Sequence, residues 1–319
     1  MRRMRTYMLK RVLSLVPTLI GVTILVFLMI RLIPGTVVDQ LIGTEGRVDE
    51  STKAAMRAFF GLDQPLYVQY WNWVTGIVRG DFGNSWRSGL PVGKMIFDRL
   101  AVTAELGLLA LGISLLVGIP LGTLSAIREN TMLDHIARVV SLFSLSVPIF
   151  WQAAMMILAL SLWFNWVPPV DYASPLRDPL ANLTQMILPA FVLGTVVAAQ
   201  VMRMTRSSLL EVLRNDYVRT ARAKGLAEKI VVSRHAFKNA LIPIVTVIGV
   251  QVGYLLGGAV VTEQVFTLPG VGRLVLNAVY ERDYPLVQGT ILFIALLFML
   301  SNLIVDLLYA YLDPRIRYD

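Results

Sequence analysis

The chain has 319 residues, of which 56% are hydrophobic and only 16% are charged, with a formal net charge of +8. This composition excludes an ordinary soluble domain and indicates a protein that crosses a membrane several times. The absence of cysteine excludes disulfides, thiolate metal sites and a cysteine nucleophile. Retention of Lys and Arg on the cytoplasmic side explains the positive charge better than nucleic-acid binding does.

The first apolar segment covers residues 12–30 and follows the basic sequence MRRMRTYMLKR. It is too long for the core of a signal peptide, and no small-residue cleavage pattern follows it. We therefore expect a retained first span and then a long external loop. Within that loop, residues 51–60 predict a short helix with Ser51 as N-cap and Gly61 at its end. The aromatic segment 64–78 is typical of a membrane interface.

Further apolar segments predict additional spans. They cover residues 101–124, 139–166, 186–202, 241–261 and 289–310. The six predicted spans give an all-α membrane protein. The fourth has the weakest pattern, because it is short and contains Pro189, Gly194 and Gln200. The distribution of Lys and Arg between the predicted loops places both termini in the cytoplasm.

Several residues of the spans are candidates for pore lining or helix packing. Pro148 can serve either a simple bend or a hinge of a transport pathway, and the sequence leaves both open. Gly249, Gly253 and Gly257 are spaced by four, so they share one helical face and favour close packing, with pore lining as the alternative. Gln200 lies near the inner end of the fourth span.

No motif for catalysis or for ATP binding is present. The sequence contains no G-x-x-x-x-G-K-[ST], no H-E-x-x-H and no G-x-S-x-G, and its two histidines are far apart. We therefore expect no catalytic residue and no metal site. The middles of the spans also lack acidic residues, which disfavours the alternative of a stand-alone secondary transporter driven by an ion gradient.

The segment 216–243, DYVRTARAKGLAEKIVVSRHAFKNALIP, is basic and polar between two spans. Its pattern predicts one short helix over 217–224, ended by Gly225, and a second over 228–238. It resembles the "EAA" loop of ABC importer permeases, whose first helix docks on the ATPase. The family's E-A-A-x-x-x-G falls on Arg219, Thr220, Ala221 and Gly225, so only the second Ala and the Gly are kept.

Further motifs carry the resemblance along the whole chain. They include GDFGNSW at 80–86, VPIFW at 147–151, TARAKGL at 220–226, LPGVGRL at 268–274 and VDLLYAYLDPRIR at 305–317. In this succession the chain resembles permease subunits of the dipeptide, oligopeptide and nickel branch of ABC importers. The resemblance implies the permease fold of type I ABC importers. It divides the chain into an N-terminal span with its external loop (1–100), a core (101–310) containing a coupling loop (203–240), and a cytoplasmic tail (311–319).

The resemblance also implies partners. A homologous second permease, two ATPase subunits that hold ATP and Mg²⁺, and an extracytoplasmic binding protein would surround this chain, which itself would bind lipid but neither a cofactor nor nucleic acid. The outer loop 263–288 would meet the binding protein. The residues expected to contact the ATPase are Arg219, Thr220, Ala221, Lys224, Gly225 and Leu226.

The cargo is the least determined feature. Peptide is the default for this branch, and nickel chelates, glutathione, opines and sugars are the alternatives. An external binding protein implies the cell membrane or inner membrane of a bacterium or archaeon.

Overall fold

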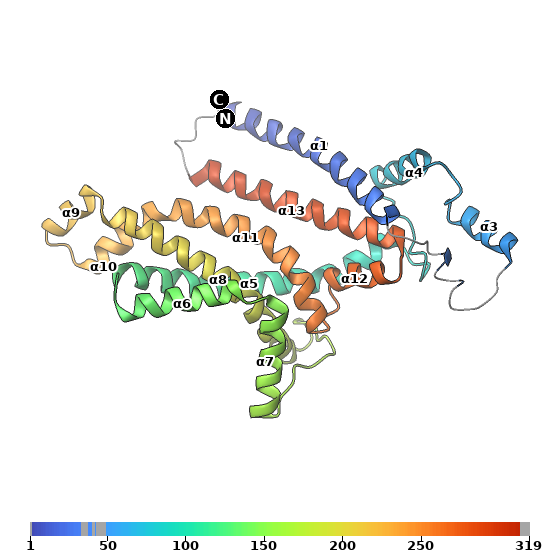
Figure 1. The fold of residues 1–319 in the computed structure, drawn as a ribbon. Helices are drawn as coiled ribbons and strands as arrows, with labels where there is room; N and C mark the ends of the chain where they lie inside the picture. The colour runs from blue at the N-terminus through green and yellow to red at the C-terminus, as the bar shows by residue number, and fades with distance from the viewer. Residues whose placement is uncertain (1, 33–37, 40–41, 43–48, 313–319) are drawn as a thin grey trace. The chain divides into compact units, whose positions relative to one another are not determined.

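A computed structural model describes residues 2–32, 38–39, 42 and 49–312 (Figure 1). These residues form helices joined by turns and loops, and the described β pairing is an isolated bridge between Asn84 and Pro91. The chain divides into two compact units: Met1–Val102 with Pro269–Leu300, and Thr103–Leu268 with Ser301–Asp319. The predicted tail 311–319 lies almost wholly outside the described residues, and the predicted domain boundaries stay predictions.

Among the described residues, five helices are long and apolar enough to cross a membrane, and a bent pair can form a sixth span. The long ones belong to α1 (Arg2–Leu32), α5 (Val92–Ile127), α8 (Pro179–Leu213), the run Glu228–Val265 and α13 (Tyr284–Leu312). The bent pair is α6 (Met132–Ser146) and α7 (Ile149–Phe164). The predicted all-α membrane architecture is confirmed.

The third predicted span, 139–166, in which Pro148 was expected to make a bend or a hinge, is divided into two helices. The axes of α6 and α7 differ by 107°. Proline drives the preceding residue out of the helical region, and Val147 has φ −89° and ψ 128° immediately before Pro148. The Gln152 side chain donates to the carbonyls of Ser144 (3.0 Å) and Val147 (2.9 Å), so the break keeps its backbone groups hydrogen-bonded. Pro148 therefore marks a sharp corner.

The first unit contains α3 (Glu50–Phe59), α4 (Leu66–Val78) and α12 (Val271–Tyr280) beside α1. The helix predicted over 51–60 is confirmed as α3, with Asp49 rather than Ser51 as its N-cap, and the aromatic segment 64–78, for which no helix was predicted, forms α4. The buried carboxylate of Asp283 accepts hydrogen bonds from the backbone N–H groups of Trp86 (3.1 Å) and Leu286 (3.3 Å). This carboxylate fixes the glycine-rich loop before α5 to the start of α13.

The centre of the second unit is α8. Small residues let α5 and α8 cross at close range: a Cβ added to Gly122 would lie 2.6 Å from the Met202 carbonyl oxygen. A Cβ added to Gly194 would lie 2.7 Å from the Ala110 carbonyl oxygen. Such crossings are a common way to associate helices in lipid, where burial of apolar surface gives little driving force. The span with the weakest sequence pattern is thus the helix around which this unit packs.

Candidate functional site

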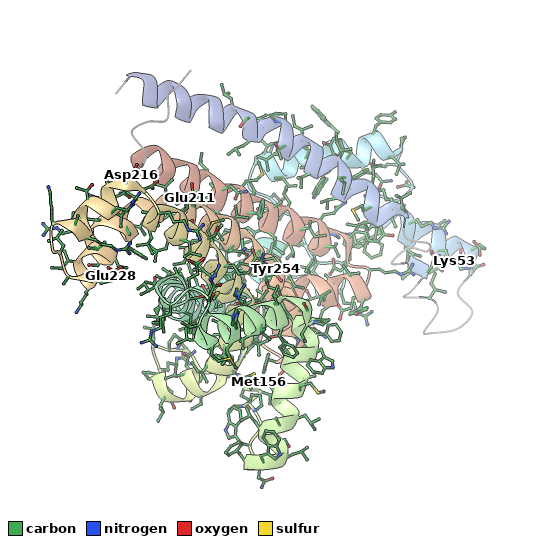
Figure 2. The ribbon with its side chains drawn as sticks, turned by 60° about the vertical axis from the view of Figure 1, so that its left-hand side comes forward. Lys53, Met156, Glu211, Asp216, Glu228 and Tyr254 are labelled. Carbon is green, nitrogen blue, oxygen red and sulfur yellow. The ribbon has the colours of Figure 1, made fainter. Side chains whose placement is uncertain are left out.

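The loop predicted to couple to an ATPase begins where α8 ends. Helix α9 (Asp216–Ala223) starts after Asn215, whose carbonyl accepts from the amides of Val218 (3.0 Å) and Arg219 (3.3 Å). It ends at Gly225, whose φ of +78° is a left-handed conformation that glycine adopts without strain. Asp216, at the start of α9, and Glu228, just after the turn, lie at the same end of the second unit (Figure 2). The predicted helix and its glycine corner are confirmed.

The predicted separate helix over 228–238 is wrong. α10 (Glu228–Ile230), a π-helical stretch over Val231–Ala236 and α11 (Phe237–Val265) form one run that continues into the fifth span. The sequence has no glycine or proline between Gly225 and Pro243 to end it. The π-helical stretch changes the backbone hydrogen-bond pattern locally without ending the helix. The coupling loop is therefore α9 plus one turn, set between two long helices.

One face of α9 is buried. Val218 and Ala221 pack with Val231, and Val212 and Leu213 of α8 lie against this cluster. Arg222 closes the turn by donating from Nε (3.1 Å) and Nη2 (2.7 Å) to the carboxylate of Glu228, an interaction that raises the pKa of the Arg222 guanidinium. These contacts hold α9 on the ends of the two long helices.

The structure separates the six predicted contact residues into two groups. Ala221 is only 7% exposed and faces the core of the loop, so its small side chain sets how closely α9 packs. The other five are exposed: Arg219, Thr220, Lys224, Gly225 and Leu226. A partner that docks on α9 would meet these five residues.

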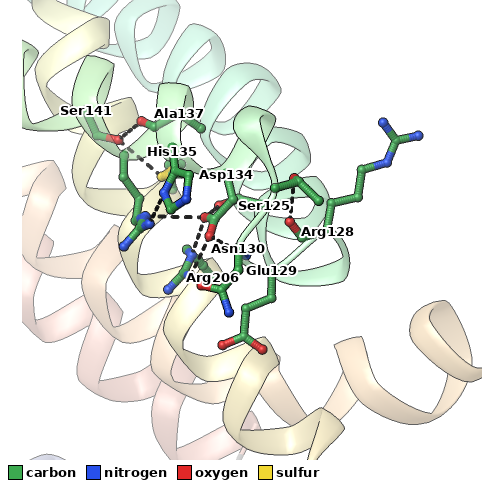
Figure 3. A network of polar contacts seen from close by, with 12 residues as sticks. Ser125, Arg128, Glu129, Asn130, Asp134, His135, Ala137, Ser141 and Arg206 are labelled. Carbon is green, nitrogen blue, oxygen red and sulfur yellow. Dashed lines mark hydrogen bonds and ion pairs between the residues drawn. The ribbon is translucent and has the colours of Figure 1, made fainter.

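Beyond the loop, a buried carboxylate ties α6 to α8 (Figure 3). Asp134 of α6 is fully buried and accepts from Arg206 of α8 through Nε (2.7 Å) and Nη2 (2.9 Å). It also accepts from the Ser125 hydroxyl and the Asn130 amide. Sequence reasoning missed this site. The spacing of Asp134 and Arg138 by four residues is typical of a local ion pair and was not used, and nothing in the pattern points to Arg206.

The candidate pore and packing residues are distributed along the second unit. Gln200 of α8 accepts a hydrogen bond from Gln251 of α11. Gly249 packs against Val305, and Gly253 is buried. A Cβ added to Gly257 would meet no other atom within 4 Å.

The neighbouring Gly258, by contrast, packs against Leu193 of α8. Close packing along the fifth span therefore uses Gly249 and Gly258 rather than an unbroken face through Gly257. Among the residues that the structure describes, no three His, Asp or Glu side chains gather as a metal site would require.

Comparison with known proteins identifies the family. Residues 118–318 match the family described as "Binding-protein-dependent transport system inner membrane component", and residues 4–107 match its N-terminal counterpart. The dipeptide transport system permease protein DppB of Escherichia coli K12 is 41% identical, over 99% of each chain. DppB of Alkalihalophilus pseudofirmus is 40% identical, over 99% of this chain and all of its own.

A solved structure of an amino acid ABC transporter with histidines shares the fold. It is 16% identical, with a TM-score of 0.51, and the match covers 70% of this chain and 95% of that one. The family match spans most of the chain, and the relatives are transport permeases rather than enzymes. The chain therefore belongs to the family of binding-protein-dependent transport system inner membrane components, the multi-pass permease subunits of ABC importers.

Proposed function

We propose that this chain forms half of the translocation pore of an ABC importer for dipeptides and oligopeptides, in the cell membrane or inner membrane of a bacterium or archaeon. The cargo assignment is supported by the relatives, which are named dipeptide permeases and match this chain over nearly its full length. The other half of the pore is a homologous second permease. A binding protein on the outer side delivers the peptide, and both termini of this chain face the cytoplasm.

The observation that carries the coupling role is the exposed face of α9. This helix is short and packs on α8 and on Val231 of the π-helical stretch, while Arg219 and Thr220 on it, and Leu226 just after it, are exposed. An apolar side chain flanked by cations fits a cleft that has an apolar floor and an acidic rim. Two partner ATPases would bind there and hydrolyse ATP with Mg²⁺, while this chain itself binds no cofactor and is not catalytic.

Helix α9 is joined directly to two long helices of the proposed pore, so its movement would move them too. α8 leads into α9, and the run from Glu228 to Val265 leads out of it, without a loose linker on either side. Leu209 of α8 and Val232, Ala236 and Ile244 of the following run share one buried cluster. Displacement of α9 by an ATPase would therefore move both long helices together, because packed helices shift as bodies.

The test is ATPase activity of the reconstituted complex with its binding protein, comparing Gly225→Val with Gly225→Asn. Valine is strongly disfavoured at φ +78°, whereas asparagine tolerates the left-handed region. We expect Gly225→Val to abolish stimulation in a complex that still assembles, and Gly225→Asn to retain most of it. Equal stimulation in both would refute the coupling role. A dipeptide library added to the unmutated complex tests the cargo, and failure of every peptide to stimulate would refute peptide import.

A further inference from the structure

A cavity of about 670 Å³ lies between α6, α8 and α11 in the second unit. Its polar lining consists of Arg138, Gln200, Arg203, Arg206 and Ser207, and its apolar lining includes Leu142 and Val247. This volume is in the range of small-ligand sites, roughly 300–1,000 Å³. None of the residues that line it is acidic, so an anion meets no repulsion from its walls.

The cavity carries an excess of positive charge. Three guanidinium groups line it, and the buried carboxylate behind them is Asp134, which pairs with Arg206 and lies 3.6 Å from Arg138. Within the described part of the chain, Arg203 forms no ion pair with a carboxylate, and its side chain is exposed. One carboxylate against three cations leaves the cavity with a net positive charge.

Two of the donors, on Arg206 and Gln200, are held in position before any ligand arrives. Asp134 takes up Nε and Nη2 of Arg206, which fixes the plane of the guanidinium and leaves Nη1 as a donor. Gln251 occupies the carbonyl oxygen of Gln200, which leaves the NH₂ group of Gln200 as a further donor. Fixed donors bind an anion more tightly than mobile ones, since less side-chain entropy is lost.

Arg203 and Arg206 lie within the last three turns or so of α8, just beyond the apolar segment 186–202. Basic residues are common at the cytoplasmic end of a span, so their place in the sequence alone does not call for a ligand. What distinguishes these two is that both line one cavity together with Arg138 of α6.

We propose that this cavity binds the carboxylate of a peptide in transit, with the arginines and Gln200 holding the anion and Leu142 and Val247 contacting the adjacent side chain. The inference rests on the proposed peptide import. It assigns to the permease a binding site of its own for the cargo, separate from the site on the binding protein.

The experiment uses the complete complex of permeases and ATPases in nanodiscs of phosphatidylcholine, without binding protein. Saturation-transfer NMR measures the Kd of dialanine and of dialanine amide, which lacks the carboxylate. We expect dialanine to bind roughly tenfold more tightly than the amide, and the double variant Arg138→Gln, Arg203→Gln to lose that preference. Arg177→Gln, which changes an exposed arginine outside the cavity, removes one positive charge elsewhere and should change neither value.

Equal binding of the two probes to the unmutated complex, or an unchanged preference in the double variant, would overturn the proposal. Nanodiscs that contain phosphatidylglycerol separate cargo from lipid: displacement of dialanine by this lipid would assign the cavity to a headgroup phosphate and also overturn it. The proposed function fails separately. If peptides stimulate the ATPase but their binding is unchanged by the arginine substitutions, only the proposed cavity site is contradicted. If no peptide stimulates the ATPase, peptide import itself is contradicted.

Discussion

The spans α1 and α8 show opposite relations between apolarity and burial. The most apolar window of α1 exceeds that of α8 in mean hydropathy, yet 17% of its residues are buried against 78% for α8. Leu25 and Met29 of α1 are more than half exposed, while Leu193 and Met186 of α8 are fully buried. A side chain that faces lipid must be apolar, whereas one that faces protein can be small or polar if it finds a partner.

Polar residues on α8 have such partners. The Gln185 side chain donates to the Pro169 carbonyl (3.0 Å), and the Asn182 side chain donates to the Ala173 carbonyl (2.9 Å). Both residues are buried, and together they hold the loop before α8 against it. Polar groups that lower the hydropathy of α8 are therefore satisfied by protein partners, which suits a helix at the centre of its unit.

Among the variants that test this contrast, Asp134→Ala is expected to cause the largest loss of stability. The substitution leaves Arg206 beside an empty, buried site, and loss of one partner of a buried ion pair costs about 3 kcal/mol. Thermal unfolding of the purified chain in detergent would measure the loss. Glu50→Gln is the control, because this carboxylate is 84% exposed where it pairs with Lys53, and its removal should leave the melting temperature nearly unchanged. A melting temperature unchanged in Asp134→Ala would contradict the anchoring role.

The next effect compares two glycines directly. Gly194→Val on α8 forces side-chain atoms onto the Ala110 backbone and should destabilise the chain by about 2 kcal/mol. Gly21→Val on α1 makes the same change where no atom lies within 4 Å, so little loss is expected. Folded yield after detergent extraction and the melting temperature check both variants. Equal losses would show that burial does not separate these two helices.

The smallest effect concerns the turn after α9. Arg222→Gln removes the bidentate pair with Glu228, and because both groups are exposed the cost in stability should be about 0.5 kcal/mol or less. Amide hydrogen exchange in α9 should nevertheless become faster, since one of its attachments is gone. Lys229→Gln, a neighbouring exposed cation with no ion pair among those described, serves as the matched control. Unchanged exchange in Arg222→Gln would mean that the apolar cluster alone holds the helix.

Local signals predicted the elements of this fold well. Long apolar runs located the membrane-capable helices, and Gly225 located the end of α9, because a positive φ and a helix stop are both properties of glycine itself. The sequence did not decide whether Pro148 bends the helix or breaks it, since a proline within an apolar run can do either. Only the neighbouring groups, such as Gln152, decide which.

Contacts between distant segments could not be predicted in the same way. Asp134 and Arg206 are 72 residues apart, and no periodicity connects them. The spacing of Gly249, Gly253 and Gly257 indicated close packing on α11, yet Gly122 and Gly194 make close contacts that no spacing rule selected. Whether a small residue packs depends on which helix crosses it, and that is a property of the assembled unit.

The most direct measurement of the central claim is cross-linking from α9 to the ATPase in the assembled complex. The chain has no cysteine, so Thr220→Cys gives it a single thiol that a benzophenone maleimide can modify. We predict that illumination joins this chain to the ATPase, and that Ala221→Cys, which places the thiol on the buried face of the same helix, gives little product. No ATPase adduct from Thr220→Cys, or equal yields from both positions, would contradict the assignment of the exposed face of α9 as the coupling surface.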